Sequence, residues 1–171
     1  MAVNRACVGV ALLGWCSVVS GVTAQELAAI EDRLLIAEQL AQYSYRWDGK
    51  DAVGFSELFT EDGVMERWSR GELIAGSRVT GRQAIREYAS TSHTGRLADR
   101  QTRHHFSGLV FLELTSVHAV TENMALITHQ PIGQAAAHIT ASGIYRNIWR
   151  KTAGGWRIAE RVLFNDRMTP C

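Results

Sequence analysis

The chain has 171 residues and a formal net charge of +1. No basic stripe stands out, so a nucleic-acid partner is not expected. The length suits one domain of ordinary size with a substantial hydrophobic core.

The N-terminal segment has the layout of a secretory signal peptide. Residues 6–22 are apolar or small and carry no charge, and Val22-Thr23-Ala24 places small residues before Gln25. This pattern predicts a signal peptide over residues 1–24, a mature domain over 25–171 and a periplasmic or secreted location. An N-terminal anchor is the alternative, but the apolar run is near the lower limit for a span and contains Gly and Ser. We therefore expect no stable membrane span after cleavage.

The cysteines agree with export to a compartment where no disulfide is needed. Cys7 and Cys16 leave with the predicted signal, and Trp15 before Cys16 disfavours a lipoprotein. Only Cys171 remains, so no intrachain disulfide can form in the mature chain. This fits a bacterial exported protein better than a disulfide-stapled module.

A long helix over residues 26–47 opens the mature domain, because the segment is rich in Ala, Leu, Glu and Gln. Its predicted buried stripe consists of Ile30, Leu34, Ala37 and Ala41. Asp48 follows Ile30 by five helical turns and so falls in line with that stripe. Either Asp48 only caps the helix, or its carboxylate points into a pocket, since a buried charge needs partners.

The remaining pattern places helices before strands. We expect the following elements in the first half: a short helix over 52–59, a turn at 60–63, a strand over 64–68, a polar connection or hairpin over 70–77, a helix over 82–90 and a flexible loop over 92–101. In the second half we expect these: a strand over 103–115 buried on both faces, a turn at 122–123, strands over 124–130 and 139–151, a hairpin turn at 152–155, and a strand over 156–164 whose alternation Glu160 interrupts. The order predicts an α+β fold, with helices packed in a strongly curved, mostly antiparallel sheet that leaves a cone-shaped cavity.

Four ordered motifs carry a family resemblance. The first helix ends in a Tyr-x-x-x-x-Asp-x-x-Asp pattern that starts at Tyr43, and Leu-Phe-Thr-Glu-Asp-Gly follows at 58–63. Gly-Arg-Gln-Ala-Ile at 81–85 resembles a family helix start, and the hairpin at 150–158 contains Gly-Trp-Arg-Ile. Together they resemble the SnoaL-like polyketide cyclase and scytalone dehydratase branch of the nuclear transport factor 2-like superfamily, over about residues 28–164.

The resemblance implies a cone-shaped α+β barrel and a small hydrophobic carbonyl or cyclic compound as the bound molecule. It implies a lyase or isomerase of dehydratase type that needs no cofactor, and a homodimer is common in the superfamily. The fold carries many chemistries, so a non-catalytic ligand-binding or assembly domain remains the alternative. An epoxide hydrolase would need a second pocket carboxylate with Arg and Asn around a water, and no matching set occurs.

In dehydratase-like members the Asp at the helix end pairs with a His on the first long strand. Two registers are open here, His104 and His105. His105 begins His-Phe-x-Gly and Glu113 follows it by eight residues, as in scytalone dehydratase, so the resemblance favours His105 as the catalytic partner of Asp48. Such a pair suits general acid–base chemistry. The plainer interpretation is a half-buried strand histidine and a helix-end hydrogen bond.

Four further residues are candidates for substrate binding. The resemblance nominates Tyr43, His129 and Tyr145, the last at a position where scytalone dehydratase carries Asn. A regular helix would not put Tyr43 and Asp48 on one face, so helical geometry prefers Tyr45, three residues before Asp48. Each aromatic residue could instead be part of the core.

Other site types lack their patterns. No H-E-x-x-H, paired Cys, phosphate loop or nucleophile elbow occurs, so we expect no metal.

Overall fold

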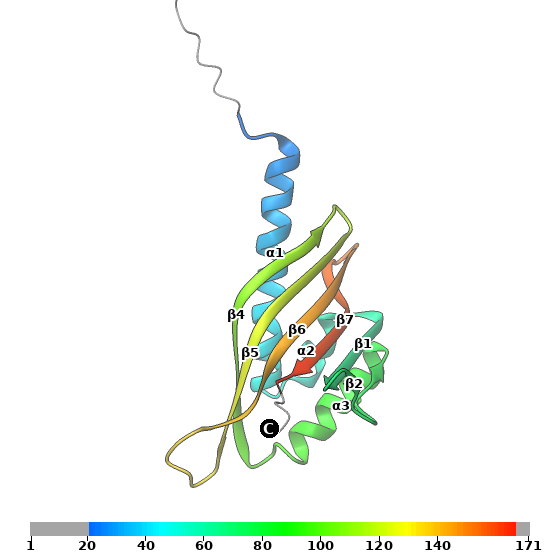
Figure 1. Cartoon of the computed structure of the whole chain (residues 1–171). Coiled ribbons are helices and arrows are strands. Elements are labelled where there is room, and N and C mark those ends of the chain that lie inside the picture. The colour runs from blue at the N-terminus through cyan, green and yellow to red at the C-terminus, as the bar shows by residue number, and fades with distance from the viewer. Residues whose placement is uncertain (1–20, 167–171) are drawn as a thin grey trace, which may run out of the picture.

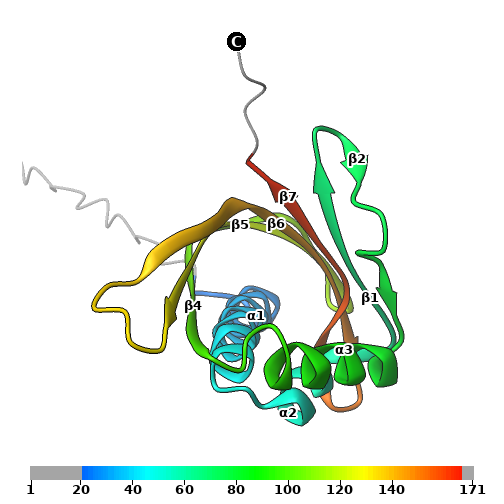
Figure 2. The same cartoon turned by 90° about the horizontal axis from the view of Figure 1, so that it is seen from below.

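The computed structural model describes residues 21–166 and has three helices on the concave side of one curled sheet. The sheet has seven strands in the order β2-β1-β7-β6-β5-β4, and β3 pairs with β1. Only the β1–β7 pair is parallel. Figure 2 shows that the sheet arches over the helices without closing on itself. The predicted α+β fold with a strongly curved, mostly antiparallel sheet is confirmed.

The elements occur in this order: α1 (Ala24–Asp48), α2 (Ala52–Glu57), β1 (Phe59–Ser69), β2 (Glu72–Leu73), β3 (Val79–Thr80), α3 (Arg82–Thr94), β4 (Arg100–Leu114), β5 (His118–Pro131), β6 (His138–Thr152) and β7 (Gly155–Asn165). The signal peptide predicted for residues 1–24 lies mostly outside the described residues and stays a prediction. No helix within residues 21–166 is long and apolar enough to cross a membrane.

The first helix begins and ends with cap structures that its sequence specifies. Thr23 and Glu26 form a capping box at the start. Gly49 caps the end, and Lys50 with a φ of 58° turns the chain toward α2. Asp51 then caps α2 by accepting from the backbone N of Gly54 at 2.8 Å.

The buried face of α1 differs from the predicted stripe. Ile30 and Leu34 are 51% and 67% exposed, because the first turns of the helix extend beyond the sheet (Figure 1). The face that enters the core instead consists of Ile36, Leu40, Tyr43 and Trp47. These residues recur at intervals of three and four, so they share one side of the helix.

A buried carboxylate attaches α1 to the hairpin between β6 and β7. Asp32 Oδ1 accepts from Lys151 Nζ at 2.7 Å and from Trp156 Nε1 at 2.8 Å. Burial raises the pKa of Asp32, but the hydrogen bonds from Lys151 and Trp156 outweigh it and leave the pKa below its ordinary value. The same end of the core contains Trp149 and Ile158, both at 0% exposure.

Two predicted turns lie inside strands. Residues 60–63 belong to β1, where the β1–β7 register shifts between Phe59 and Val64. Residues 122–123 lie within β5, and the chain turns earlier, between β4 and β5. Glu61 and Asp62 are exposed to solvent, whereas Asn123 is 2% exposed and accepts from Asn147 Nδ2 at 3.3 Å, so this sheet holds polar residues on either face.

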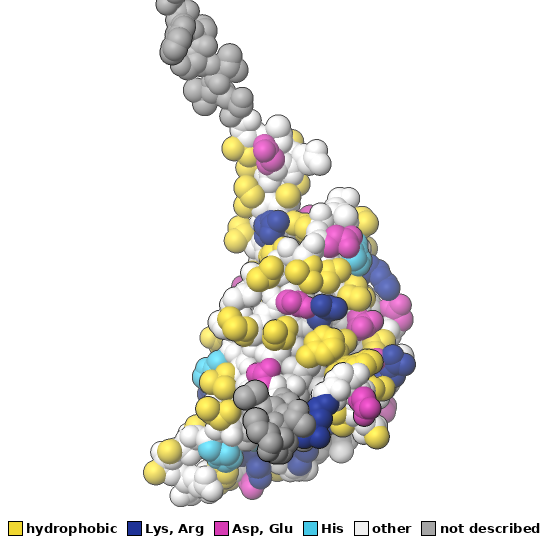
Figure 3. All heavy atoms as spheres, viewed as in Figure 1, with side chains coloured by type: hydrophobic (Ala, Val, Ile, Leu, Met, Phe, Trp, Pro, Cys, Tyr) yellow, Lys and Arg dark blue, Asp and Glu magenta, His cyan; other side chains and the backbone are white. Residues whose placement is uncertain are grey.

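The outer face of the sheet is exposed. The predicted double-sided burial of residues 103–115 is therefore wrong, since Val110 and Leu112 are each 53% exposed. Figure 3 shows apolar and charged side chains mixed over this face. Only the inner face, with the helices, encloses the core and the cavity.

Candidate functional site

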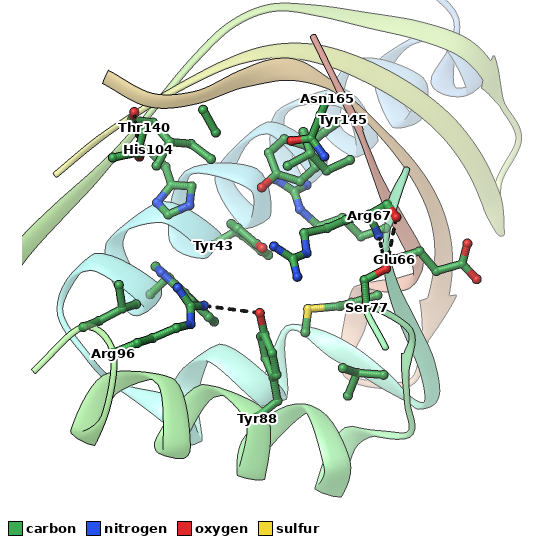
Figure 4. A pocket seen from close by; sticks show the side chains of 18 of the residues that line it. Tyr43, Glu66, Arg67, Ser77, Tyr88, Arg96, His104, Thr140, Tyr145 and Asn165 are labelled. Carbon is green, nitrogen blue, oxygen red and sulfur yellow. Dashed lines mark hydrogen bonds between the residues drawn. The ribbon is translucent and has the colours of Figure 1, made fainter. Parts of the chain in front are cut away.

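A cavity of about 260 Å³ opens between the inner face of the sheet and the helices. Seven of the longer elements contribute to its walls: α1, α3, β1, β4, β5, β6 and β7. The side chains used in the argument below are Tyr43, His104, His129, Tyr145 and Arg161. Figure 4 shows His104, Tyr43 and Tyr145 around the hollow, with Tyr88 and Arg96 on its α3 side.

His104, not His105, lies beside Asp48. His104 Nδ1 is 2.8 Å from Asp48 Oδ1, and its side chain is 8% exposed. His105 is exposed on the other face of β4, where its Nε2 lies 3.3 Å from Thr128 Oγ1. The preference for His105 is corrected by strand alternation, because consecutive residues point to opposite faces.

The spacing that favoured His105 also lacks a structural basis. Glu113 is exposed and lies 3.1 Å from His118 Nδ1, away from His105. The strand register shifts between Ser107 and Val110, with Gly108 at a φ of 63°. A count of residues along β4 therefore does not report which face a distant side chain occupies.

The Asp48 carboxylate accepts three hydrogen bonds. Thr102 Oγ1 donates to Oδ1 at 2.7 Å, the backbone N of His104 donates to Oδ2 at 2.8 Å, and the His104 ring lies against Oδ1. Burial raises the pKa of Asp48, but these bonds and the His104 charge outweigh it, so the pKa falls below its ordinary value. An ionised carboxylate only accepts hydrogen bonds, so in the neutral form of the His104 ring the proton lies on Nδ1 and Nε2 carries the lone pair.

Tyr43 and Tyr145 line the cavity, as the resemblance predicts, while Tyr45 does not. Tyr45 is 77% exposed, because it falls outside the buried face of α1. Tyr43 need not share a helix face with Asp48, because Asp48 contacts His104 and His104 lines the cavity. The rings of His104 and Tyr43 lie 6.2 Å apart. Burial raises the pKa of both cavity tyrosines, so their phenols stay protonated at neutral pH.

His129 also lines the cavity, from β5. Burial, followed by the charges of Arg100 and His104, lowers its pKa. Its ring lies 6.5 Å from that of His138. Within residues 21–166, no group of three or more His, Cys, Asp or Glu side chains is placed to hold a metal ion.

The sequence reasoning missed Arg161, which is 1% exposed. Its guanidinium carbon lies 3.6 Å from the ring centroid of Tyr145 and 3.8 Å from that of Tyr43, an arrangement that stabilises a cation. Nη1 donates to Asn147 Oδ1, and within the described part of the chain Nε and Nη2 have no acceptor. Buried donors of this kind are expected to bind water or a ligand.

A signal for Arg161 was present in the interrupted alternation of β7. Ile158 pairs with Trp149, but Glu160 pairs with Ile148, so one extra residue bulges out between them. The bulge reverses the inward and outward positions and turns Arg161 toward the cavity. The break in alternation at Glu160 therefore indicated that the following residues change face. The sequence alone did not show which of them point toward the cavity.

Comparison with known proteins gives the family. The sequence profile of the SnoaL-like domain matches residues 28–162. The chain belongs to the SnoaL-like family. No curated protein matches this SnoaL-like chain in a sequence search.

Solved structures share the fold of this SnoaL-like protein. An Asp-to-Asn variant of a Mycobacterium tuberculosis protein of unknown function is 31% identical, with a TM-score of 0.69, over 82% of this chain and 75% of that one. An NTF2-like protein with a cystatin-like fold from Novosphingobium aromaticivorans is 24% identical, with a TM-score of 0.72, over 86% and 92%. A protein from the same organism that is described as a candidate scytalone dehydratase is 22% identical, with a TM-score of 0.67, over 83% and 89%. At these identities the last two establish the fold alone.

Proposed function

We propose that this SnoaL-like protein is a cofactor-independent lyase or isomerase that moves a proton next to a carbonyl group of a small cyclic compound. The observation that carries the proposal is the Asp48–His104 pair, with His104 at the cavity wall and Asp48 behind it. Of these two residues, His104 alone lines the cavity, so it is the catalytic residue and Asp48 is its positioning residue. The family's name and the dehydratase described among its structural neighbours are consistent with such chemistry.

The proton transfer follows from the tautomer that Asp48 selects. The Nε2 lone pair of His104 takes a proton from the carbon beside the carbonyl, and the electron pair of that C–H bond forms the enolate. Asp48 stabilises the resulting imidazolium, as carboxylates do in other carboxylate–histidine pairs. The imidazolium then returns the proton, to another carbon in an isomerase or to a departing hydroxyl in a dehydratase.

The enolate oxygen needs donors that are fixed before the reaction. Arg161 provides a buried cation whose Nε and Nη2 have no acceptor among the described residues, and it is held between the rings of Tyr43 and Tyr145. The two phenols remain protonated and can donate as well. Preorganised donors in a site with little water stabilise developing negative charge strongly.

Enolisation of simple ketones tests this proposal without knowledge of the natural substrate. The measurement is deuterium incorporation from D₂O into 2-tetralone and a panel of other cyclic ketones, followed by proton NMR. We expect the wild-type protein to accelerate exchange, and His104→Asn to reduce the acceleration by about 10²- to 10⁴-fold.

His105→Asn is the matched control, because it changes a neighbouring histidine on the outer face of β4. Its exchange rate should stay within about twofold of wild type, since surface substitutions rarely disturb a site. Exchange no faster than in buffer across the panel, or equal losses in the two variants, would overturn the proposal. The first result would also favour a binding domain over an enzyme.

A further inference from the structure

The cavity wall carries more positive than negative charge. Three arginines line it, Arg67 from β1, Arg96 beyond α3 and Arg161 from β7. The single acidic residue in the wall is Glu66. The direction of its carboxylate therefore decides the electrostatic character of the cavity.

Glu66 is turned away from the cavity and neutralised. Its Oε1 accepts from Arg78 Nε at 2.5 Å and its Oε2 from Trp68 Nε1 at 2.7 Å. Strand alternation puts Met65 and Arg67 on the opposite face of β1 from Glu66. Figure 4 shows the Glu66 carboxylate pointing outward, while Arg67 extends toward the hollow.

None of the three arginines forms an ion pair with a carboxylate of residues 21–166. Arg96 Nη2 has only neutral partners, Tyr88 Oη and Ser92 Oγ, each at 3.3 Å. The Arg67 guanidinium has no hydrogen bond to any other described residue, although its backbone bonds to Ser77. Arg96 and Tyr88 extend into the hollow from the α3 side (Figure 4).

Arg67 and Arg161 lie on adjacent strands. In the parallel β1–β7 register, Arg161 pairs with Met65 and Leu163 pairs with Arg67, so the two arginines are one inward position apart. Like charges gathered without a counterion repel each other. An anion in the cavity would relieve that repulsion, and low-dielectric walls would focus the field on it.

We propose that the substrate carries a carboxylate on a ring system, and that Arg67 and Arg96 bind this carboxylate. The aromatic walls, with Tyr43, Trp47 and Tyr145, favour a ring-bearing acid over a free inorganic anion. The position of the reacting carbonyl, at His104 and Arg161, rests on the proposed function. The preference for an anion rests on the charges alone and is measured without turnover.

The test is calorimetric titration of wild-type protein with 2-naphthoate and with its neutral counterpart 2-naphthamide. We expect the carboxylate to bind at least about tenfold more tightly, since hydrogen bonds to charged groups are the stronger ones. Arg67→Gln and Arg96→Gln should each weaken naphthoate binding by about tenfold and leave naphthamide unchanged.

Arg86→Gln is the matched control, because Arg86 is an exposed arginine of α3 that does not line the cavity. It should bind both compounds as wild type does, and thermal melts should show that all variants are folded. Equal wild-type affinity for the two compounds, or an unchanged preference in both the Arg67 and Arg96 variants, would overturn the inference. Inorganic phosphate bound as tightly as naphthoate would overturn the preference for a ring-bearing acid.

A titration of His104→Asn separates this inference from the proposed function. If the variant keeps the carboxylate preference while deuterium exchange is lost, both stand. If the preference holds but exchange never depended on His104, the proposed function fails and the anion site remains. If exchange depends on His104 but wild type shows no carboxylate preference, this inference alone fails.

Discussion

Two consecutive histidines on β4 occupy opposite environments. His104 lies on the inner face, 8% exposed and 2.8 Å from Asp48, whereas His105 is exposed on the outer face. They have the same side chain and adjacent positions, and differ only in the face that strand alternation gives them. For these two histidines, the face decides whether the ring is held by a buried carboxylate or meets solvent.

The same contrast holds for apolar side chains. Ile158 on β7 is 0% exposed within the core, whereas Ile139 on β6 is 65% exposed. Paired substitutions, one inside and one outside, can therefore measure what the inner face contributes.

The largest expected effect is on the Asp48–His104 pair. Asp48→Asn replaces a carboxylate that only accepts hydrogen bonds by an amide that can also donate. The amide can therefore favour the His104 tautomer with its proton on Nε2, which cannot act as the base. We expect deuterium exchange into the ketone to fall by about 10³- to 10⁴-fold. The pH–rate profile of the residual activity should also change, which a purely structural role would not predict. Asp51→Asn is the control, because it keeps a capping side chain at α2, and it should stay within about twofold. Similar losses in both variants would contradict the assigned role of Asp48.

The next effect is on packing. Ile158→Ala should lower the free energy of unfolding by about 2–5 kcal/mol, because it leaves a cavity in the core. Ile139→Ala should change it by less than about 0.5 kcal/mol. Urea denaturation followed by circular dichroism measures both values, and a comparable loss in the outer variant would show that this face is covered in solution.

A smaller difference in the free energy of unfolding is expected between a buried carboxylate, Asp32, and an exposed one, Asp62. Asp32→Asn should cost about 1–3 kcal/mol at neutral pH, since it weakens the bonds from Lys151 and Trp156. Asp62, whose side chain is 66% exposed beside Arg150, should contribute less than about 1 kcal/mol.

The pH dependence of the Asp32 effect has a definite sign. Its folded pKa lies below the ordinary value, so its contribution is present above the unfolded pKa of about 3.9 and is lost as the pH falls through the folded value. Thermal melts from neutral pH into the acid range should show the gap between wild type and Asp32→Asn closing below about pH 4. A gap that stays constant would contradict the lowered pKa.

The smallest expected effect concerns the buried side chain of His93. It is 5% exposed and packs on Trp47. Neither of its ring nitrogens has a hydrogen-bond partner within the described residues. Burial, followed by the charges of Lys50 and Arg96, lowers its pKa. The unfolded chain therefore binds this proton more readily, and stability should decrease as the pH falls below about 6.5. His93→Phe should flatten this part of the stability profile, whereas substitution of the exposed His118 by Asn should leave it in place.

The elements with strong local signals were predicted well. The segments 26–47, 82–90, 139–151 and 156–164 each lie within an observed helix or strand of the predicted type. The misplaced turns at 60–63 and 122–123 share one cause, since polar residues were taken as chain reversals. The first set lies at a bulge of β1, and Asn123 is hydrogen-bonded to Asn147 inside the sheet. The buried stripe of α1 was wrong because the sheet covers only the later turns of the helix.

The sequence by itself determined the fold family and the place of Asp48 at the end of the first helix. The family resemblance nominated Tyr43, Tyr145 and His129 for substrate binding; all three line the cavity, and their role stays a prediction. Capping residues, hydrophobic periodicity and ordered motifs are local, so they can be read along the chain. Only the tertiary structure decided that His104 faces Asp48 and that Arg161 enters the cavity with no carboxylate partner among residues 21–166. Both depend on bulges and strand register, which the pairing of distant segments fixes and which a shift of one residue reverses.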